Sequence, residues 1–417
     1  MFVLFSRLIH RLLARQHFWR HVDFPELAEL YAARILRSTA VSLVTIFVAI
    51  YMYQNDYSVI YITLFFAGYF VYRALLALPM AYVVGHIGPK HGTLYSNLLY
   101  VPALIALAAL PDMGLMALLI YAFFQGLSMT LFMVSYLVDF SKVRHSDHVG
   151  KEIGFMQIMD RLGTTLSPLL GGLLAYLFGP QVTIFVAVFI FAIAALPLFF
   201  TPEPVQVKQR VSLRGGLNLH TVRGAMSFIG VGVDHGASIF LWPLFLVLVV
   251  FTSGTDIVYA QIGLMASVAV IAALVAAKVY GMLIDRARGR QLLEVSVFLN
   301  SGLHLSRLFV ASPVGVVAFN IANEVATAGY HMPYAKGVLD TADQSEENRV
   351  GYVAFSEVFS CLGVVVIMVI AAAFVHVLGD VDGLRAQYVA AATLTLLILA
   401  HGFRVYRKNP LVPNFMK

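Results

Sequence analysis

Nine ionisable side chains interrupt long apolar stretches of this sequence, far from the ends of those stretches. They are Arg37, Arg73, Asp160, Arg161, Asp234, His235, His304, Arg307 and Glu324. Because a charge is costly inside a lipid bilayer, such residues usually face protein or a water-filled cavity. There an arginine can bind an anionic group, and a carboxylate or imidazole can exchange a proton. The alternative is a set of charges that pair with one another and hold helices together.

The composition indicates that lipid, rather than water, surrounds most of the chain. Hydrophobic residues make up 60% of the 417 residues and charged residues only 12%, against roughly a quarter in soluble domains. A spanning helix uses about 20 apolar residues, so this length provides about twelve spans with short loops. Little is left for an extramembrane enzyme domain. The single cysteine, Cys361, excludes a disulfide within the chain.

The apolar stretches form two groups of six, separated by a polar linker. The first group covers 24–53, 57–84, 93–110, 114–140, 149–178 and 181–201, and the second covers 219–251, 257–283, 292–311, 314–339, 350–378 and 386–406. We predict an all-α polytopic membrane protein with an amino-terminal bundle at 23–201, a linker at 202–218, a carboxy-terminal bundle at 219–407 and a tail at 408–417. Both the linker and the tail are expected to be cytoplasmic.

The basic residues predict the topology. If the amino terminus is cytoplasmic, the outside turns carry only Arg385, and the other loop arginines and lysines lie inside. This asymmetry predicts an even number of spans and cytoplasmic termini. The net charge of +6 then reports topology, so we expect membrane lipids and no nucleic acid as partners.

Residues 1–22 have the pattern of an amphipathic helix lying on the membrane surface. Arg7, Arg11 and Arg15 recur every four residues and therefore share one helical face. They also interrupt the apolar run that a signal peptide requires. A frayed basic tail is the alternative.

The two halves resemble each other weakly. Gly85 has a counterpart in Gly281, and residues 137–163 align with 338–363 when one residue is gapped, which pairs Gly163 with Gly363. Many transporters are internal duplications whose halves move against one another around a central site.

The segment "GMLIDRARGRQ" resembles the signature between the second and third spans of each half in the major facilitator superfamily. Gly281, Asp285, Arg286, Gly289 and Arg290 carry the match. The resemblance implies two pseudo-symmetric bundles of six helices and gate residues at the cytoplasmic mouth. The gate candidates are Asp139, Asp285, Arg286, Arg290 and Asp340, with an ordinary basic inside loop as the alternative for the motif. Glu357 also lies nearer the cytoplasmic surface, where it could pair with Arg286, Arg290 or Lys90, and a surface acid neutralised by a basic collar is the alternative for it. The first-half equivalent, "GHIGPKHG", has proline where the family has its acid.

The fifth span is similar to the antiporter motif of the same family. The match rests on Gly154, Gly163, Pro168, Gly171 and Gly172, with serine replacing one glycine. Small residues allow close helix contact and a proline can kink the helix, so we expect a packing hinge. The resemblance implies export by exchange, whereas a helix contact without directional meaning is the alternative. The fourth span has Ala122 where drug–proton antiporters of the family carry an arginine.

In this family the first, second, fourth and fifth spans of each half line the central cavity. The resemblance therefore selects Arg37, Arg73, Asp160, Arg161, Asp234, His235, Asn320 and Glu324 as substrate or ion candidates. The arginines are expected to bind an anionic group, and Asp234 or Glu324 to exchange a proton, which would suit a zwitterion. His304 and Arg307 fall on an outer span and are assigned no role, with Arg307 expected to reach the interface.

We expect a secondary transporter, because no phosphate-binding loop of an ATP-driven pump is present. Proton-coupled export of an amphipathic or zwitterionic compound leads, with nutrient uptake or lipid flipping as alternatives. A membrane enzyme or a transport-inactive receptor is the competing class, but no HExxH or GxSxG pattern occurs. No cofactor or metal is expected. A monomer in a bacterial inner membrane is the expected setting.

Overall fold

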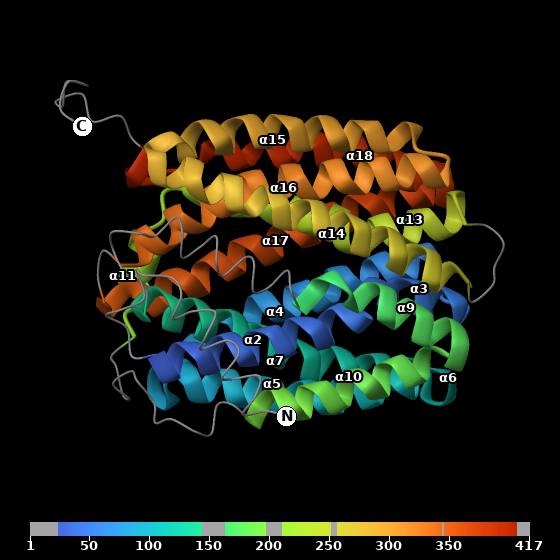
Figure 1. The fold of residues 1–417 in the computed structure, drawn as a ribbon, viewed down its shortest axis with the longest axis horizontal. Helices are drawn as coiled ribbons and strands as arrows, with labels where there is room; N and C mark the ends of the chain where they lie inside the picture. The colour runs from blue at the N-terminus through green and yellow to red at the C-terminus, as the bar shows by residue number, and fades with distance from the viewer. Residues whose placement is uncertain (1–23, 144–162, 197–210, 252–256, 344–345, 407–417) are drawn as a thin grey trace.

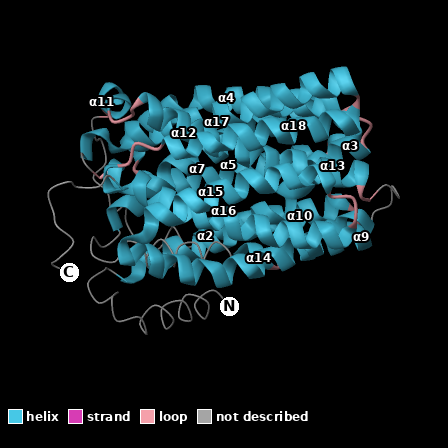
Figure 2. Ribbon diagram, turned by 90° about the horizontal axis from the view of Figure 1, so that it is seen from above, coloured by secondary structure: helices cyan, strands magenta, loops and turns pink. Residues whose placement is uncertain are grey.

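The computed structural model describes residues 24–143, 163–196, 211–251, 257–343 and 346–406. Every regular element among these residues is a helix, as Figure 2 shows, and the all-α prediction is confirmed. The predicted surface helix at 1–22 and the tail at 408–417 lie outside the described residues.

Each of the six predicted spans of the amino-terminal half is represented by at least one helix. They are α2 (Phe24–Val44) continued by α3 (Val48–Gln54), α4 (Val59–Ile87), α5 (Pro89–Ala108), α7 (Leu115–Val143), α9 (Ser167–Phe178) and α10 (Pro180–Ala195). A short 3-10 turn separates α2 from α3, and the one-turn helix α6 (Leu110–Met113) precedes α7.

The carboxy-terminal half repeats this plan. Its helices are α12 (Val222–His235) continued by α13 (Trp242–Val249), α14 (Ile257–Leu283), α15 (Gly289–Ser306), α16 (Pro313–Ala342), α17 (Glu346–Leu378) and α18 (Asp380–Thr395). A π-helical turn at Gly236–Leu241 joins α12 to α13.

Seven described stretches are apolar and long enough to cross a membrane. They are Ala32–Gln54, Val59–Ile87, Leu115–Val138, Val222–Val249, Ile257–Phe309, Asn348–Leu378 and Asp380–Ala400. The fifth of these contains α14 and α15 in succession, so it provides two crossings. At 1.5 Å per residue, a helix such as α4 exceeds the thickness of the hydrocarbon core, about 30 Å.

Glycine sets the tight turn between the last two spans of each half. Gly179 and Gly379 have φ angles of 90° and 84°, which favour a residue without a side chain. Pro180 follows the first of them and begins α10, where the missing N–H of proline is not needed. The two turns occupy equivalent places in the two halves.

The halves meet along two pairs of neighbouring helices. Figure 1 shows α4 beside α17 in the middle of the molecule and α9 beside α14. We call the end that carries α11 (Leu213–Asn218) the linker end, and the end that carries the turn from α17 to α18 the opposite end. The largest hydrophobic core contains residues of both halves, including Phe66 of α4 and Phe245 of α13.

The second part of the predicted linker is a helix docked on α17. Gly216 of α11 lies so close to Gly351 of α17 that a Cβ on either glycine would collide with the backbone of the other segment. The His220 ring then stacks on Tyr352, with ring centroids 4.4 Å apart, and its Nε2 lies 3.1 Å from the Tyr352 carbonyl oxygen. Burial lowers the pKa of His220 to about 4, so the docked imidazole is neutral.

Candidate functional site

An ion pair joins the two halves near the middle of the bundle. Nη2 of Arg73 on α4 donates to Oε1 of Glu357 on α17, and the two side chains are 6% and 13% exposed. Sγ of Cys361, one turn further along α17, lies 3.5 Å from the same carboxylate oxygen. Glu357 was expected near the cytoplasmic surface beside other basic residues, and the structure places it against Arg73 instead.

Aromatic rings cover this ion pair on the side of the opposite end. The guanidinium carbon of Arg73 lies 5.0 Å from the Phe70 ring centroid, which is within cation–π range. Phe66 and Phe240 meet across the two halves with ring centroids 4.4 Å apart, and Phe70 lies 5.5 Å from Phe240. A charged pair and an apolar layer therefore adjoin each other between the halves.

His235 adds a titratable group to the same region. Its ring lies 6.5 Å from Phe70 and 6.0 Å from Phe240, yet the side chain remains exposed. His331 on α16 is also exposed in the middle of its helix and is close enough to interact electrostatically with His235. Two exposed imidazoles therefore lie close to each other beside the aromatic layer.

The polar residues of α16 are less deeply buried than those of the ion pair. Asn320 and Glu324 are partly buried, and with His331 they follow helical spacing of four and seven residues. Nε1 of Trp242 donates to Oδ1 of Asn320 at 2.8 Å. Asn320 therefore links α16 to α13, whereas Glu324 and His331 continue a polar stripe toward the linker end.

Asp234 lies inside the carboxy-terminal half rather than between the halves. Its Oδ1 accepts from Asn300 Nδ2 at 2.9 Å, His304 Nε2 at 2.9 Å and Ser238 Oγ at 3.3 Å, and Oδ2 accepts from the Tyr330 hydroxyl. Since Asp234 is only 2% exposed, these bonds replace its water shell. The carboxylate is held by four side chains of its own half.

The expectation that Arg307 reaches the lipid interface is wrong. His304 and Arg307 are both fully buried, and Nη1 of Arg307 lies 3.1 Å from Nδ1 of His304. Because Nδ1 accepts from arginine, the Nε2 proton points at Asp234 and the imidazole bridges an anion to a cation. The residue spacing from Asn300 to His304 and Arg307 places all three on one helical face, and this signal could have identified the network.

Arg307 is further enclosed by rings and neutral acceptors. Its guanidinium carbon lies 4.8–5.1 Å from the centroids of Phe319, Trp242 and Tyr388. Nη2 donates to Ser238 Oγ at 2.9 Å, and to Asn323 Oδ1 at 3.3 Å. An outer span can thus contribute a buried charge, because one of its faces packs against the bundle.

Arg37 occupies a comparable place inside the amino-terminal half. It donates to Asn97 Oδ1 at 2.7 Å and to Ser128 Oγ at 3.3 Å, and it lies 4.0 Å from the Phe132 ring centroid. Its side chain is 2% exposed. Among the described residues its hydrogen-bond partners are neutral and belong to the same half. Arg37 is therefore not brought to Arg73.

Gly163 and Gly363 show that the two halves share one register. A Cβ on Gly163 would collide with the Ile35 carbonyl oxygen of α2, and one on Gly363 with the Ile229 carbonyl oxygen of α12. Counted from these two carbonyl groups, the buried Arg37 lies two residues after Ile35 in α2. The buried Asp234 lies five residues after Ile229 in α12. Opposite charges therefore sit about one helical turn apart in equivalent helices.

The other small residues of the fifth span lie against two different helices. Gly171 packs on the backbone of Leu43 in α2, whereas Gly172 packs on the backbone of Tyr259 in α14. Pro168 packs on Gly263 of α14, and the Leu169 N–H donates to Ser267 Oγ at 3.1 Å. Gly154, Asp160 and Arg161 lie outside the described residues.

Two of the gate candidates that can be placed pair with a residue of their own helix, and two are exposed in a turn. Asp285 and Arg286 are exposed in the turn from α14 to α15, where Ala287 has a φ angle of 60°. Arg290 pairs with Glu294 at 2.8 Å on the same helix. Asp340 lies 3.4 Å from Lys336 in the same way. The side chain of Asp139 is outside the described part of the structure.

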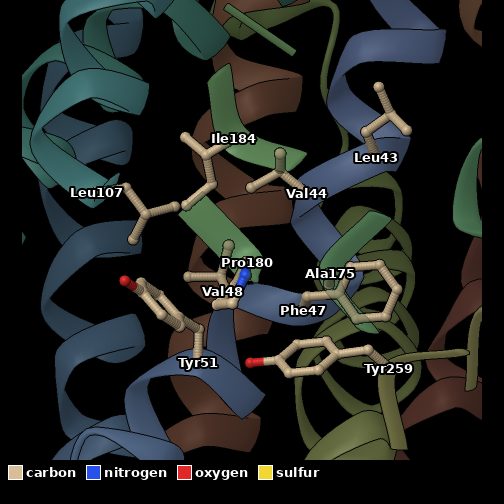
Figure 3. Close-up of a pocket in the computed structure, with 10 residues that line it drawn as sticks. All are labelled: Leu43, Val44, Phe47, Val48, Tyr51, Leu107, Ala175, Pro180, Ile184 and Tyr259. Atoms are coloured by element: carbon tan, nitrogen blue, oxygen red, sulfur yellow. The ribbon is translucent and has the colours of Figure 1, made fainter. Parts of the chain in front are cut away.

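A small pocket opens where α2 bends into α3 (Figure 3). Its walls are Leu43, Val44, Phe47, Val48, Tyr51, Leu107, Ala175, Pro180, Ile184 and Tyr259. The lining is apolar except for two phenol groups, and the hydroxyl of Tyr259 donates to Gln54. None of these lining residues is charged. The described residues also contain no group of three or more potential metal ligands.

Apolar helices in two halves of six define a polytopic membrane protein. The sequence matches the Major Facilitator Superfamily over residues 30–259, more than half of the chain. The protein belongs to this superfamily, whose members are transporters rather than enzymes. No curated protein matches the sequence.

Solved structures of the superfamily share the fold. The human organic anion transporter MFSD10 (TETRAN) is 14% identical, with a TM-score of 0.67. The E. coli fucose:proton symporter FucP is also 14% identical, with a TM-score of 0.63, and a bacterial homologue of the iron transporter ferroportin in an outward-facing state is 12% identical, with a TM-score of 0.64. Each comparison covers 89% of this chain and 97% of the other. At this identity the likeness shows the fold alone, and the predicted fold class of two six-helix bundles is confirmed.

Proposed function

We propose that the protein is a secondary active transporter that moves a small organic molecule by alternating access. The Arg73–Glu357 ion pair carries this proposal, because it places opposite charges of the two halves in direct contact near the middle of the bundle. Substrate sites of such transporters lie near the midplane between the repeats.

Contacts at both ends of the bundle support alternating access. Toward the opposite end, Phe47 and Tyr259 meet with ring centroids 5.3 Å apart. Toward the linker end, Val84, Val138 and Val353 belong to one hydrophobic cluster. Opening one of these contacts at a time would admit a substrate from one side of the membrane, so we take the two ends as the two gates.

The surroundings of Arg73 favour an amphipathic substrate with an anionic group. The guanidinium group binds carboxylate, sulfonate or phosphate oxygens. Phe66, Phe70 and Phe240 lie next to it and provide apolar surface for the rest of the molecule. A zwitterion is the variant expected from the sequence, with its ammonium group near Glu324 or another acid of the carboxy-terminal half.

Two directions of transport follow from two different observations. The glycines of α9 and their similarity to the antiporter motif favour proton-coupled export. The Arg73–Glu357 pair favours uptake, because an anion and a proton that bind together at this pair would enter the cell down the proton gradient. Cytoplasmic termini follow from the distribution of basic residues, and a bacterial inner membrane is favoured by the short loops. A monomer, the default of the family, completes the proposal.

Transport by the purified full-length chain in proteoliposomes tests this function. Three labelled probes with one skeleton separate the substrate classes: phenylethanesulfonate, phenylalanine and phenylethyltrimethylammonium carry an anion, a zwitterion and a cation. We expect exchange of the anion or the zwitterion, and its loss in Arg73→Ala. Absence of movement of all three by folded protein would count against a transporter of this substrate class and leave a receptor or lipid-moving role.

A further inference from the structure

We infer that the anionic substrate and one proton bind together, with the substrate on Arg73 and the proton on Glu357. The inference rests on the proposed transport function and adds the residue that carries the proton. It replaces Asp234 and Glu324, the carboxylates that the sequence favoured for this role.

The first step concerns the free side of Arg73. Glu357 engages Nη2 alone, while the buried Nε of Arg73 has no hydrogen-bond partner among the described residues. An unpaired buried donor is unfavourable, and an anionic group with two oxygens that span Nε and Nη2 would satisfy both donors. A substrate carboxylate or sulfonate can therefore make two bonds where Glu357 makes one.

The second step concerns Glu357 after the substrate has taken Arg73. Its other hydrogen-bonding neighbour in the described structure is the Cys361 thiol, a weak donor, and the carboxylate is only 13% exposed. An unpaired carboxylate in such a place is strongly disfavoured, whereas the neutral acid is not. Glu357 therefore takes a proton as Arg73 binds the anion.

The third step is a balance of charge. The empty site holds Arg73 and ionised Glu357 and has no net charge. The loaded site holds Arg73, neutral Glu357 and the substrate anion, and its net charge is again zero. Both forms can be enclosed between the halves without an uncompensated charge in a medium of low dielectric constant. Binding of the anion without the proton would leave one negative charge unbalanced.

The other carboxylates of the bundle are less suited to this exchange. Asp234 already accepts hydrogen bonds from Ser238, Asn300, His304 and Tyr330 within its own half. Glu324 lies on α16 and is partly buried, on a different helix from the one that contacts Arg73. Glu357 is the carboxylate that the described structure places in contact with the arginine.

Uptake of phenylethanesulfonate into proteoliposomes tests the inference, because a sulfonate stays ionised and cannot carry the proton itself. With an outside pH one unit below the inside, we expect about tenfold accumulation at a ratio of one proton to one anion. The step moves no net charge, so a membrane potential set by valinomycin and potassium should change uptake little. Glu357→Gln should still exchange the sulfonate across the membrane but should lose the accumulation driven by pH.

The control is Asp382→Asn, which removes an exposed carboxylate that lies 3.7 Å from Arg385 in the turn at the opposite end. It should accumulate the sulfonate like the wild-type protein. Sulfonate transport that ignores pH and follows the membrane potential would overturn the inference while leaving a transporter. Coupling that persists in Glu357→Gln, or is lost in Glu324→Gln alone, would also overturn it. A wild-type protein that moves none of the three probes would overturn the proposed function itself.

Discussion

His304 and Arg307 form a hydrogen bond inside the carboxy-terminal half, with Nδ1 of the histidine 3.1 Å from Nη1 of the arginine. Neither side chain reaches the surface of the protein. Asp234 bonds the other ring nitrogen, Nε2. The three residues therefore form a row with no net charge, in which one imidazole ring separates an anion from a cation. This row of side chains links α12 to α15.

Replacement of Arg307 by methionine should destabilise the protein by about 3–5 kcal/mol, because it leaves a buried charge without its counterpart. Thermal unfolding in detergent measures the effect. Arg385→Met, at a position that is 39% exposed, is the matched control and should change little. The double variant Asp234→Asn with Arg307→Met should recover part of the loss. An Arg307→Met variant as stable as the wild-type protein would contradict this account.

Replacement of Gly263 by valine should separate α9 from α14. A Cβ at Gly263 would collide with the Pro168 carbonyl oxygen, which belongs to backbone that cannot move aside easily. Overpacking of this kind costs about 1–3 kcal/mol. Gly302→Val on α15 is the control, because no atom lies near its Cβ position. A lower melting temperature for the first variant only is the expected result, and equal melting temperatures would rule out tight packing here.

The pH dependence of stability should contain a contribution from His220. Its pKa is about 4 in the folded protein and about 6.5 when exposed, because docking on α17 buries it. The unfolded state therefore binds a proton first as the pH falls, and stability is lost between about pH 6.5 and pH 4. Melting temperatures of the wild-type protein and His220→Phe, measured from pH 7.5 to 4.5, test this.

His220→Phe keeps an aromatic ring for stacking but cannot titrate. Its melting temperature should fall less than that of the wild-type protein below pH 6.5. The corresponding difference in the free energy of unfolding is on the order of 2 kcal/mol. His86→Phe is the control, because His86 lies at the exposed end of α4 and should leave the wild-type profile unchanged. Parallel profiles for the wild-type protein and His220→Phe would show that His220 is not responsible.

Cys361 should report whether the interface between the halves is closed. It is the single cysteine of the chain, is 2% exposed and lies beside Glu357. A thiol reagent such as N-ethylmaleimide should therefore modify the wild-type protein slowly. Arg73→Ala removes the ion pair and should raise the rate several-fold, whereas Arg385→Ala should not. Fast modification of the wild-type protein would mean that the closed contact is rarely occupied.

The sequence by itself determined the class of the protein and its helices. Apolar stretches of span length leave helices as the main solution, because every backbone N–H and C=O must be bonded within lipid. The internal similarity also paired Gly163 with Gly363, and both glycines prove to contact the first helix of their half. These properties depend on composition and local spacing, which a single sequence contains.

The tertiary structure decided which charges meet. Arg37, Asp234 and Arg307 each interrupt an apolar stretch and look alike in sequence, yet they bind partners within their own halves. Glu357 lies nearer a helix end and still reaches Arg73, 284 residues away. Such partners depend on how each helix is rotated about its axis and which helix lies beside it. That choice is made by side-chain packing over the whole bundle, and hydrophobic periodicity alone does not fix it.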